Sequence, residues 1–286
     1  MSRFSTSLLG EAKTLLLSTD GSHYSDGAVQ EAIFFGQACQ AKVVVLHVVR
    51  IETESLKSAN AKVTRKQQEI APYMKQIRKM ARDSGVECET VVVGSSVPEH
   101  AIVEQARMRG ADVILMGRHG RAGRLYLMVG SMTAKIIGLG FPLVLVLPHE
   151  SMITGTHVLV AVEDSASSRL AVEEALSLGM CCVTLQRLTF VAVAKRQGGL
   201  ERARTMVEDI CRRGREKWPH LQFEAVAEVG HPSNIIVRAA EERNVDMIMI
   251  GGMNGGPLPR MFTGRVTKEV CGWAHCAVLV VTASPE

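Results

Sequence analysis

Short apolar runs and longer amphipathic stretches alternate along the chain. The apolar runs are three to five residues long, as in strands that are buried on both faces of a parallel sheet. They lie at residues 15–17, 43–46, 113–116 and 143–147. In the longest amphipathic stretch, Ile70, Met74 and Ile77 share one helical face. The pattern predicts alternating strands and helices, with half-exposed edge strands at 88–91 and 223–229, where polar and apolar residues mix.

One unit of this pattern occurs twice. Residues 18–28 match residues 161–171 at a constant offset of 143. Six later residues repeat at a constant offset of 134: Pro98, Ile102, Ala106, Asp112, Gly117 and Gly130 match Pro232, Ile236, Ala240, Asp246, Gly251 and Gly264. The second unit is therefore nine residues shorter between Ala171 and Pro232. Each unit is interpreted as βαβαβαβαβ.

The length and the repeat together predict two domains. At ~150 residues per domain, a chain of 286 residues is expected to hold two. The unit restarts after a segment with the Pro, Gly and small polar residues of a short linker. We expect a first domain over residues 1–148, a linker over 149–156 and a second domain over 157–286.

Composition restricts the class of protein. Hydrophobic residues make up 47% of the chain and charged residues 22%, which excludes disorder and fibres. Aromatic residues are only 4%, which favours an α/β fold over an aromatic-rich sandwich. The formal net charge of +4 is too small for nucleic acid to be an expected partner. Seven cysteines without a CxxC pair, and no signal-like or membrane-spanning apolar run, lead us to expect a cytoplasmic protein without membrane contact.

A glycine-rich loop in the second half of the first unit is the strongest candidate for chemistry. Gly117 can turn the chain away from its strand, and Gly120 can let a ligand approach the backbone. Gly130 and Ser131 open the next helix, whose free N–H groups and dipole favour an anion. Hydroxyls at Ser131 and Thr133 add donors. A positive rim is expected from Arg118, Arg121 and Arg124.

Glycines that follow a strand more often serve a turn than a ligand. Position favours the ligand here, because ligands of doubly wound sheets bind outside the carboxyl ends of the strands, where the strand order reverses. The loops after the first and fourth strands border that crevice, and Asp20 lies at the end of the first strand.

These elements resemble the universal stress protein family in its tandem form, over nearly the whole chain. Two motifs carry the resemblance: Gly117-x2-Gly120-x9-Gly130-Ser131, and Asp20-Gly21-Ser22 after the first strand. It implies two Rossmann-like domains of the adenine nucleotide α-hydrolase type. Each would be a five-stranded parallel sheet of order 3-2-1-4-5 with helices on both faces. It also implies ATP, with Mg, in members that carry the glycine motif.

The resemblance implies a site residue by residue. Its adenine contacts map to Asp20 and to the backbone near Thr19 and Val48. Its ribose and phosphate contacts map to Met116, Gly117, Gly120, Gly130, Ser131 and Met132, beside the further candidates His119 and Thr133. The alternative for His119 is a loop histidine bonded to backbone. We expect no catalytic residue and no metal centre, because nothing completes a nucleophilic triad and no His or Cys group has zinc-ligand spacing.

The second unit departs from the motif. Asn254, Arg265 and Glu163 stand in place of Gly120, Ser131 and Asp20. A side chain at Asn254 obstructs close approach to the backbone, and Arg265 would fill the phosphate pocket or pair with an anion. We expect a degenerate, structural second site.

Three classes of function remain: a regulatory nucleotide-binding module, a slow enzyme that hydrolyses ATP or transfers an adenylyl group, and an interaction scaffold with relic sites. The enzyme is disfavoured because the only available base, Asp20, maps to the adenine end. The scaffold is disfavoured because the first motif is intact. We expect a cytoplasmic, ATP-binding stress-response regulator with an unknown protein partner. Its two domains should pair through their last strands as an internal pseudo-dimer, open to further homodimerisation.

Replacing Gly120 by Val should abolish ATP binding and leave the fold nearly intact, because the glycine lies in a loop and is needed for ligand approach. Asn254→Val is the matched change in the second unit and should alter little. Calorimetric titration and thermal unfolding of both variants check this. Equal unfolding of both variants would assign the glycine loop a structural role instead.

Overall fold

The computed structural model describes residues 9–22, 25–52, 55–118, 129–149, 153–252 and 264–283. The first half contains η1 (Leu9–Glu11), β1 (Thr14–Ser18), α1 (Asp26–Ala38), β2 (Lys42–Arg50), α2 (Leu56–Asp83), β3 (Cys88–Ser95), α3 (Pro98–Met108), β4 (Val113–Gly117), α4 (Ser131–Gly138) and β5 (Leu143–Leu147). The second half contains β6 (His157–Val162), α5 (Ala166–Cys181), β7 (Arg187–Ala194), η3 (Gln197–Gly199), α6 (Leu200–Lys217), β8 (Gln222–Val229), α7 (Pro232–Glu242), β9 (Met247–Gly251), α8 (Arg265–Trp273) and β10 (Ala277–Val281). The structure confirms the predicted alternation of strands and helices.

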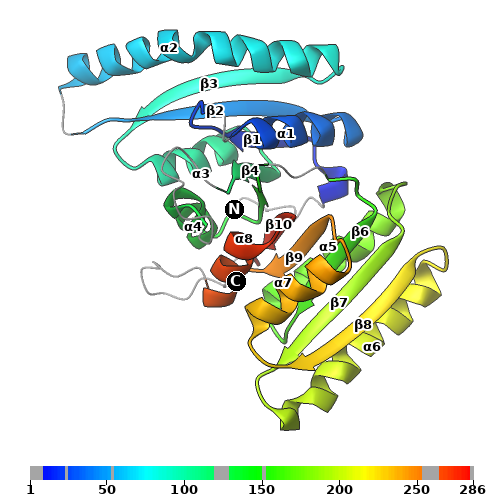
Figure 1. The fold of residues 1–286 in the computed structure, drawn as a ribbon. Helices are drawn as coiled ribbons and strands as arrows, with labels where there is room; N and C mark the ends of the chain where they lie inside the picture. Colours follow the sequence, from blue (N-terminus) through cyan, green and yellow to red (C-terminus); the bar gives the residue numbers. More distant parts are fainter. Residues whose placement is uncertain are drawn as a thin grey trace.

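All ten strands form one sheet, in the order β3-β2-β1-β4-β5-β10-β9-β6-β7-β8 (Figure 1). Within each half the strands are parallel, and counted from the outer edge they have the order 3-2-1-4-5. The α/β fold class and the strand order are therefore confirmed. The edge strands β3 and β8 are largely half-buried, as their mixed pattern predicted.

The two halves meet at β5 and β10, which pair antiparallel. Val146 lies opposite Val278, and Leu143 lies opposite Val281. The N–H of Thr282 extends the contact by donating to the carbonyl oxygen of Pro142 (2.8 Å). The prediction that the last strands pair is confirmed, and neither strand is left as an exposed apolar edge.

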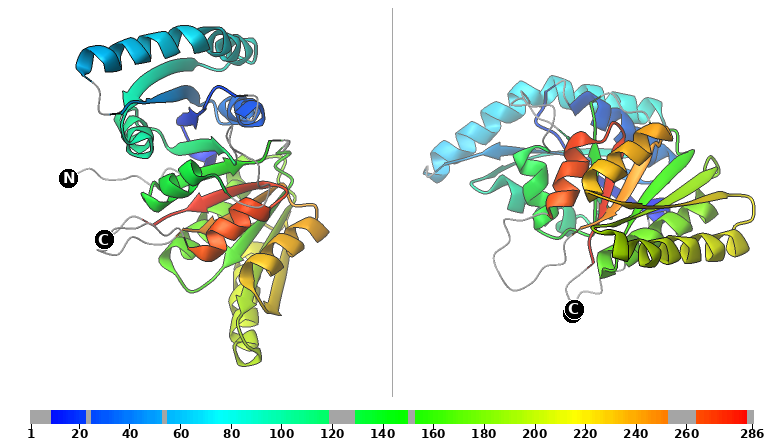
Figure 2. Two further views of the ribbon diagram at one scale, coloured as in Figure 1. Left: turned by 60° about the vertical axis from the view of Figure 1, so that its left-hand side comes forward. Right: turned by 60° about the horizontal axis from the view of Figure 1, so that its bottom comes forward.

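Helices cover both faces of the sheet (Figure 2). One core cluster contains residues of α1, α2, α5 and α6, and the other contains residues of α3, α4, α7 and α8. Side chains alternate between the two along β5: Leu143, Leu145 and Leu147 join the first, whereas Val144 and Val146 join the second. Because the residues of β10 alternate in the same way, both cores continue across the joint between the halves.

The helices also show where the second unit is shorter. α2 has 28 residues, whereas its counterpart α6 has 18. The elements after them resume the offset of 134, as in β4 and β9. The first half therefore carries a long additional piece of helix at one end of the sheet, beside the edge strand β3 (Figure 1).

Each half holds the segment that leads into the first strand of the other half. Glu31 of α1 accepts a hydrogen bond from the N–H of Ile153, which precedes β6 (2.9 Å). Glu174 of α5 accepts one from the N–H of Leu9, which precedes β1. The two glutamates are 143 residues apart, so the repeat produces this exchange twice.

Both glutamates are almost completely buried, with exposed fractions of 4% for Glu31 and 3% for Glu174. Burial raises the pKa of each carboxyl, because the charged form is poorly solvated there. The pKa of Glu174 rises to about 7, with a further contribution from the nearby charge of Glu11. The charge of Asp246 acts in the same direction on the pKa of Glu31. Ionisation of these groups therefore opposes folding.

Glu174→Gln should make the protein more stable at pH 8 and leave its stability near pH 4 unchanged. The folded state binds the proton more tightly than the unfolded state, so the stability of the wild type falls as the pH rises from about 4.5 to 7. A shift of this size corresponds to about 3 kcal/mol above pH 7. Glutamine keeps the acceptor for Leu9 and removes the charge.

Denaturant unfolding at pH 4 and pH 8 measures this effect. Glu173→Gln, on the exposed side of the same helix, is the control and should alter stability little at either pH. A Glu174→Gln variant with the same pH slope as the wild type would contradict the assignment.

Candidate functional site

The carboxyl ends of four strands meet at one edge of the first half. Ser18 of β1 pairs with Met116 of β4, and Gly117 pairs with Leu147 of β5. The N–H of Thr19, directly after β1, donates to the carbonyl oxygen of Leu46 in β2 (3.0 Å). The loops after β1 and β4 therefore lie beside each other, as expected for a crevice at the point where the strand order reverses.

Asp20 organises the loop between β1 and α1. Its Oδ1 accepts hydrogen bonds from the N–H of Ser22 (2.9 Å), from the hydroxyl of Ser22 (2.6 Å) and from the hydroxyl of Ser25 (3.2 Å). The bond two residues along the chain is an Asx turn, and Gly21 between them has φ +74°, which glycine adopts without strain. The half-buried carboxylate is thus held in a fixed orientation at the tip of β1.

Thr19 is fixed by two residues that the sequence analysis did not single out. Its carbonyl oxygen lies 2.9 Å from Nδ1 of the buried His47, and its hydroxyl lies 3.3 Å from the hydroxyl of Tyr73. Burial and the charges of Asp26 and Asp20 raise the pKa of Tyr73. His47 directly precedes the candidate Val48 on β2, but Tyr73 comes from α2, and no local sequence signal links it to this loop.

Two further candidates, Met116 and Val48, lie on strands and expose little of their side chains. Met116 is buried at the end of β4, and Val48 is half-buried near the end of β2. Only the backbone and part of the Val48 side chain are therefore available to a ligand, which suits the backbone role implied for this position.

The start of α4 has the geometry of an anion site. The N–H of Gly130 donates to the carbonyl oxygen of Arg118 (2.9 Å), and a Cβ at Gly130 would lie only 3.1 Å from that oxygen. Gly130 is the N-cap and supplies no side-chain cap, so the first-turn N–H groups of α4 have no side-chain acceptor among the described residues. Ser131 is exposed, and Met132 is half-buried.

Thr133 connects the first turn of α4 to the end of β4. Its side chain is buried, and its hydroxyl donates to the carbonyl oxygen of Gly117 (3.4 Å). Thr267 makes the same bond to Gly251 in the second half (3.3 Å). The hydroxyl therefore ties the helix to the strand in both copies.

Arg118 does not lie on a positive rim. Its guanidinium donates to the carbonyl oxygen of Ala274, the C-cap of α8 in the second half, where the helix dipole favours a cation. Its Nε is buried and has no hydrogen-bond partner among the described residues. Burial lowers the pKa of Arg118, partly offset by the nearby thiols of Cys271 and Cys276. This side chain connects the glycine loop of one half to the other half.

The equivalent crevice of the second half is closed by α5. This helix begins at Ala166 after a cap by Ser165, whose hydroxyl accepts from the N–H of Ser168 (3.1 Å). The first turn then packs on the strand tip, because a Cβ at Gly251 would lie 2.8 Å from the backbone nitrogen of Ser168. The hydroxyl of Ser167 also accepts from the N–H of Ala283, after β10 (3.1 Å).

Arg265 pairs with a carboxylate on its own helix. Its side chain is 81% exposed and bonds to Glu269, one turn along α8 (2.7 Å). Glu269 also accepts from the hydroxyl of Ser233 (2.6 Å), which lies 2.9 Å from Nδ1 of His231. Glu163 is exposed and lacks the three loop bonds of Asp20. Five residues of the sequence analysis lie outside the described residues: His119, Gly120, Arg121, Arg124 and Asn254.

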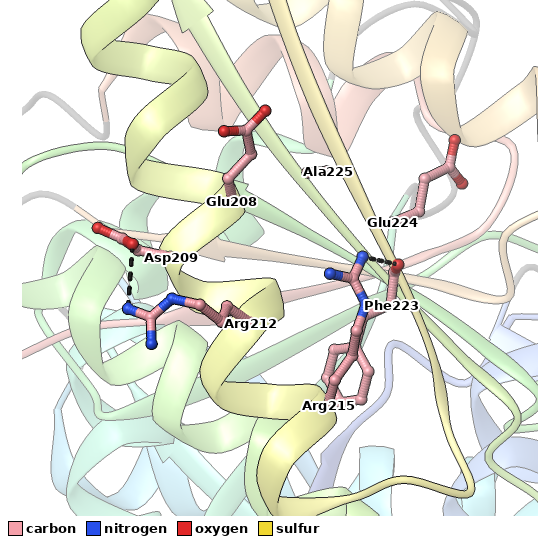
Figure 3. Close-up of a pocket in the computed structure, with 7 residues that line it drawn as sticks. All are labelled: Glu208, Asp209, Arg212, Arg215, Phe223, Glu224 and Ala225. Atoms are coloured by element: carbon pink, nitrogen blue, oxygen red, sulfur yellow. Dashed lines mark hydrogen bonds and ion pairs between the residues drawn. The ribbon is translucent and has the colours of Figure 1, made fainter.

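A separate open hollow of about 650 Å³ lies between α6 and β8 (Figure 3). Arg212 bonds to Asp209, and Arg215 donates to the carbonyl oxygen of Phe223 (2.9 Å). Glu224 bonds instead to Arg243, outside the hollow (3.0 Å). It lies at the outer edge of the second half and does not include any residue of the glycine motif.

Comparison with known proteins identifies the family. The model of the universal stress protein family matches residues 11–146 and again residues 155–282. The chain belongs to the universal stress protein family. It is a tandem member, because both halves match the same family.

Curated relatives match one half of this universal stress protein at a time. A universal stress protein of Methanocaldococcus jannaschii is 29% identical over 131 residues, which cover 44% of this chain and 75% of the relative. One of Bacillus subtilis is 26% identical over 133 residues, which cover 43% and 89%. The single-unit length of these relatives agrees with the repeat.

Solved structures match the whole chain. A universal stress protein from Archaeoglobus fulgidus has a TM-score of 0.73 at 20% identity and covers 94% of this chain and 98% of its own. A putative one from Pseudomonas aeruginosa has a TM-score of 0.69 at 15% identity, with 96% and 94% covered. These structures support the tandem fold. Within the described ranges, no helix is both long and apolar enough to cross a membrane.

Proposed function

We propose that the first half binds ATP at the carboxyl ends of β1 and β4, beside the start of α4. The second half serves as a structural partner. The observation that carries the proposal is the start of α4, where the N-cap Gly130 supplies no side-chain cap and the first helical residue, Ser131, is exposed. Backbone N–H groups at a helix start are suited to a phosphate group. At the equivalent place in the second half, the first turn of α5, with Ser167 and Ser168, packs on the end of β9.

Within this proposal, each part of the nucleotide has its own protein contacts. The N–H groups of Ser131 and Met132 and the Ser131 hydroxyl hold phosphate oxygens. The backbone at Gly117 and Met116 borders the ribose, and the fixed loop of Thr19 and Asp20 with Val48 borders the adenine. His119 and Gly120 belong to the same loop in the sequence. Magnesium would accompany the triphosphate, bound through the phosphate oxygens.

A regulatory role is favoured over catalysis. The site supplies N–H donors for phosphate, but the only carboxylate at its strand tips, among the described residues, is Asp20, whose Oδ1 already takes three hydrogen bonds. In-line phosphoryl transfer also needs a positioned nucleophile or base. ATP occupancy would then act as a cytoplasmic signal that alters the affinity for a protein partner, with slow hydrolysis as the alternative.

Ser131→Asp should weaken ATP binding at least ten-fold without harming the fold. A carboxylate at the first position of α4 repels the triphosphate, yet it interacts favourably with the helix dipole. Arg265→Asp makes the matched change at the start of α8 and should leave ATP binding unchanged. Calorimetric titration with Mg-ATP should give one site per chain for the wild type. Undetectable binding to the wild type, or equal loss in both variants, would refute the proposal.

Hydrolysis should be far slower than ~1 s⁻¹, the lower range of ordinary enzymes. Single-turnover assays with excess protein should show that bound ATP persists, and neither Asp20→Ala nor Ser131→Ala should remove a fast phase. Several turnovers per second in the wild type, lost in either variant, would place the protein among the enzymes.

A further inference from the structure

Positive charge is concentrated on α2, the helix at the far end of the first half. The helix carries eight basic residues, Lys57, Lys62, Arg65, Lys66, Lys75, Arg78, Lys79 and Arg82. Its only acidic residues are Glu69 and Asp83. The difference of six positive charges exceeds the net charge of +4 of the entire chain. The small overall charge therefore conceals a strongly basic surface on one element.

Four of these cations form a ridge along the second part of the helix. Lys75, Arg78, Lys79 and Arg82 are spaced at i, i+3, i+4 and i+7 and are all exposed, so they share one outward face about 10 Å long. None of the four forms an ion pair within the described part of the chain, and Arg78 only donates to the hydroxyl of Thr90 (3.1 Å). Like charges at this spacing destabilise an isolated helix.

The counterpart helix α6 shows that this arrangement is not a requirement of the fold. α6 has six basic and four acidic residues, and most of its arginines are paired. Arg204 pairs with Glu201 (2.8 Å), and Arg212 pairs with Asp209 (3.2 Å), as Figure 3 shows for the latter. The two helices in equivalent places thus differ in net charge, since basic residues exceed acidic ones by six on α2 and by two on α6.

The chemistry of the ridge indicates its partner. Protein partners and membranes are usually held by exposed aromatic or aliphatic anchors beside the charges. Leu56 is the only large exposed hydrophobic residue found on α2 within the described residues, and it lies at the opposite end. Single-stranded nucleic acid needs exposed rings for stacking, but the hydroxyl of the half-buried Tyr73 is turned towards Thr19. A duplex backbone is recognised by cations alone.

We propose that the ridge of Lys75, Arg78, Lys79 and Arg82 is a docking surface for the phosphate backbone of a nucleic-acid duplex, without sequence readout. The helix that carries the ridge, α2, lies at the end of the sheet remote from the second half (Figures 1 and 2). The inference departs from the expectation based on the net charge, and it does not depend on ATP binding.

The test measures binding of the full chain to a DNA duplex of about 24 base pairs as a function of salt. The wild type should bind with a slope of log K against log salt of about −3 to −4, as expected for three or four phosphate contacts. The triple variant Lys75→Gln, Lys79→Gln, Arg82→Gln should lose about 3 units of slope and at least ten-fold in affinity at about 50 mM salt. It keeps the bond between Arg78 and Thr90, so thermal unfolding should be unchanged.

The matched control removes three positive charges from α6: Arg204→Gln, Arg212→Gln, Arg213→Gln. It changes the net charge by the same amount and should keep the DNA affinity within about two-fold, because the ridge is intact. Equal loss in both triple variants would show a general charge effect and overturn the proposal. So would undetectable DNA binding by the wild type at low salt, or tighter ridge-dependent binding to vesicles that contain phosphatidylglycerol.

Discussion

Antiparallel pairing between β5 and β10 determines how the two halves meet, and most other features of the molecule depend on it. Both strands are buried along their whole length, so each would expose an apolar edge without the other. Because the pairing is antiparallel, the carboxyl ends of the strands in one half lie at the edge where the strands of the other half begin. The loops that follow the strands therefore lie on opposite sides of one continuous sheet in the two halves.

This arrangement allows the two copies to diverge. The C-terminus of α8 leads into β10 and so lies near the end of β4, where Arg118 can reach the carbonyl oxygen of Ala274. The corresponding position after β9 is Gly252, which has no side chain to return the contact. Both copies keep the bond from a helix threonine to the strand tip, at Thr133 and Thr267. The halves thus share these bonds but differ after the fourth strand, where Arg118 stands in one half and Gly252 in the other.

The internal repeat made most of the fold predictable, because a constant offset keeps every residue on the same face of the same element. β1 and β6 begin 143 residues apart, and α4 and α8 begin 134 residues apart. The details of the site depended on contacts that no local pattern reveals. The bond from Arg118 to Ala274 is one example. Because the two residues are 156 positions apart, no local pattern predicts it, and the sequence alone indicated a place on the rim. α5 begins three residues earlier than the offset from α1 predicts, since Ser165 caps it there, and this early start closes the second crevice.

In each half, a buried glutamate binds the segment that precedes the first strand of the other half. These bonds affect the order in which the chain can fold during synthesis. Leu9 and its acceptor Glu174 are separated by 165 residues. At ribosomal rates of about 5–20 residues per second, the N-terminal segment emerges roughly ten to thirty seconds before that acceptor exists. The five strands of the first half can assemble in this interval, but the bond from Leu9 to Glu174 cannot form, and β5 must wait longer still for β10. Until β10 is made, a nascent first half therefore presents the apolar edge of β5 to the cell.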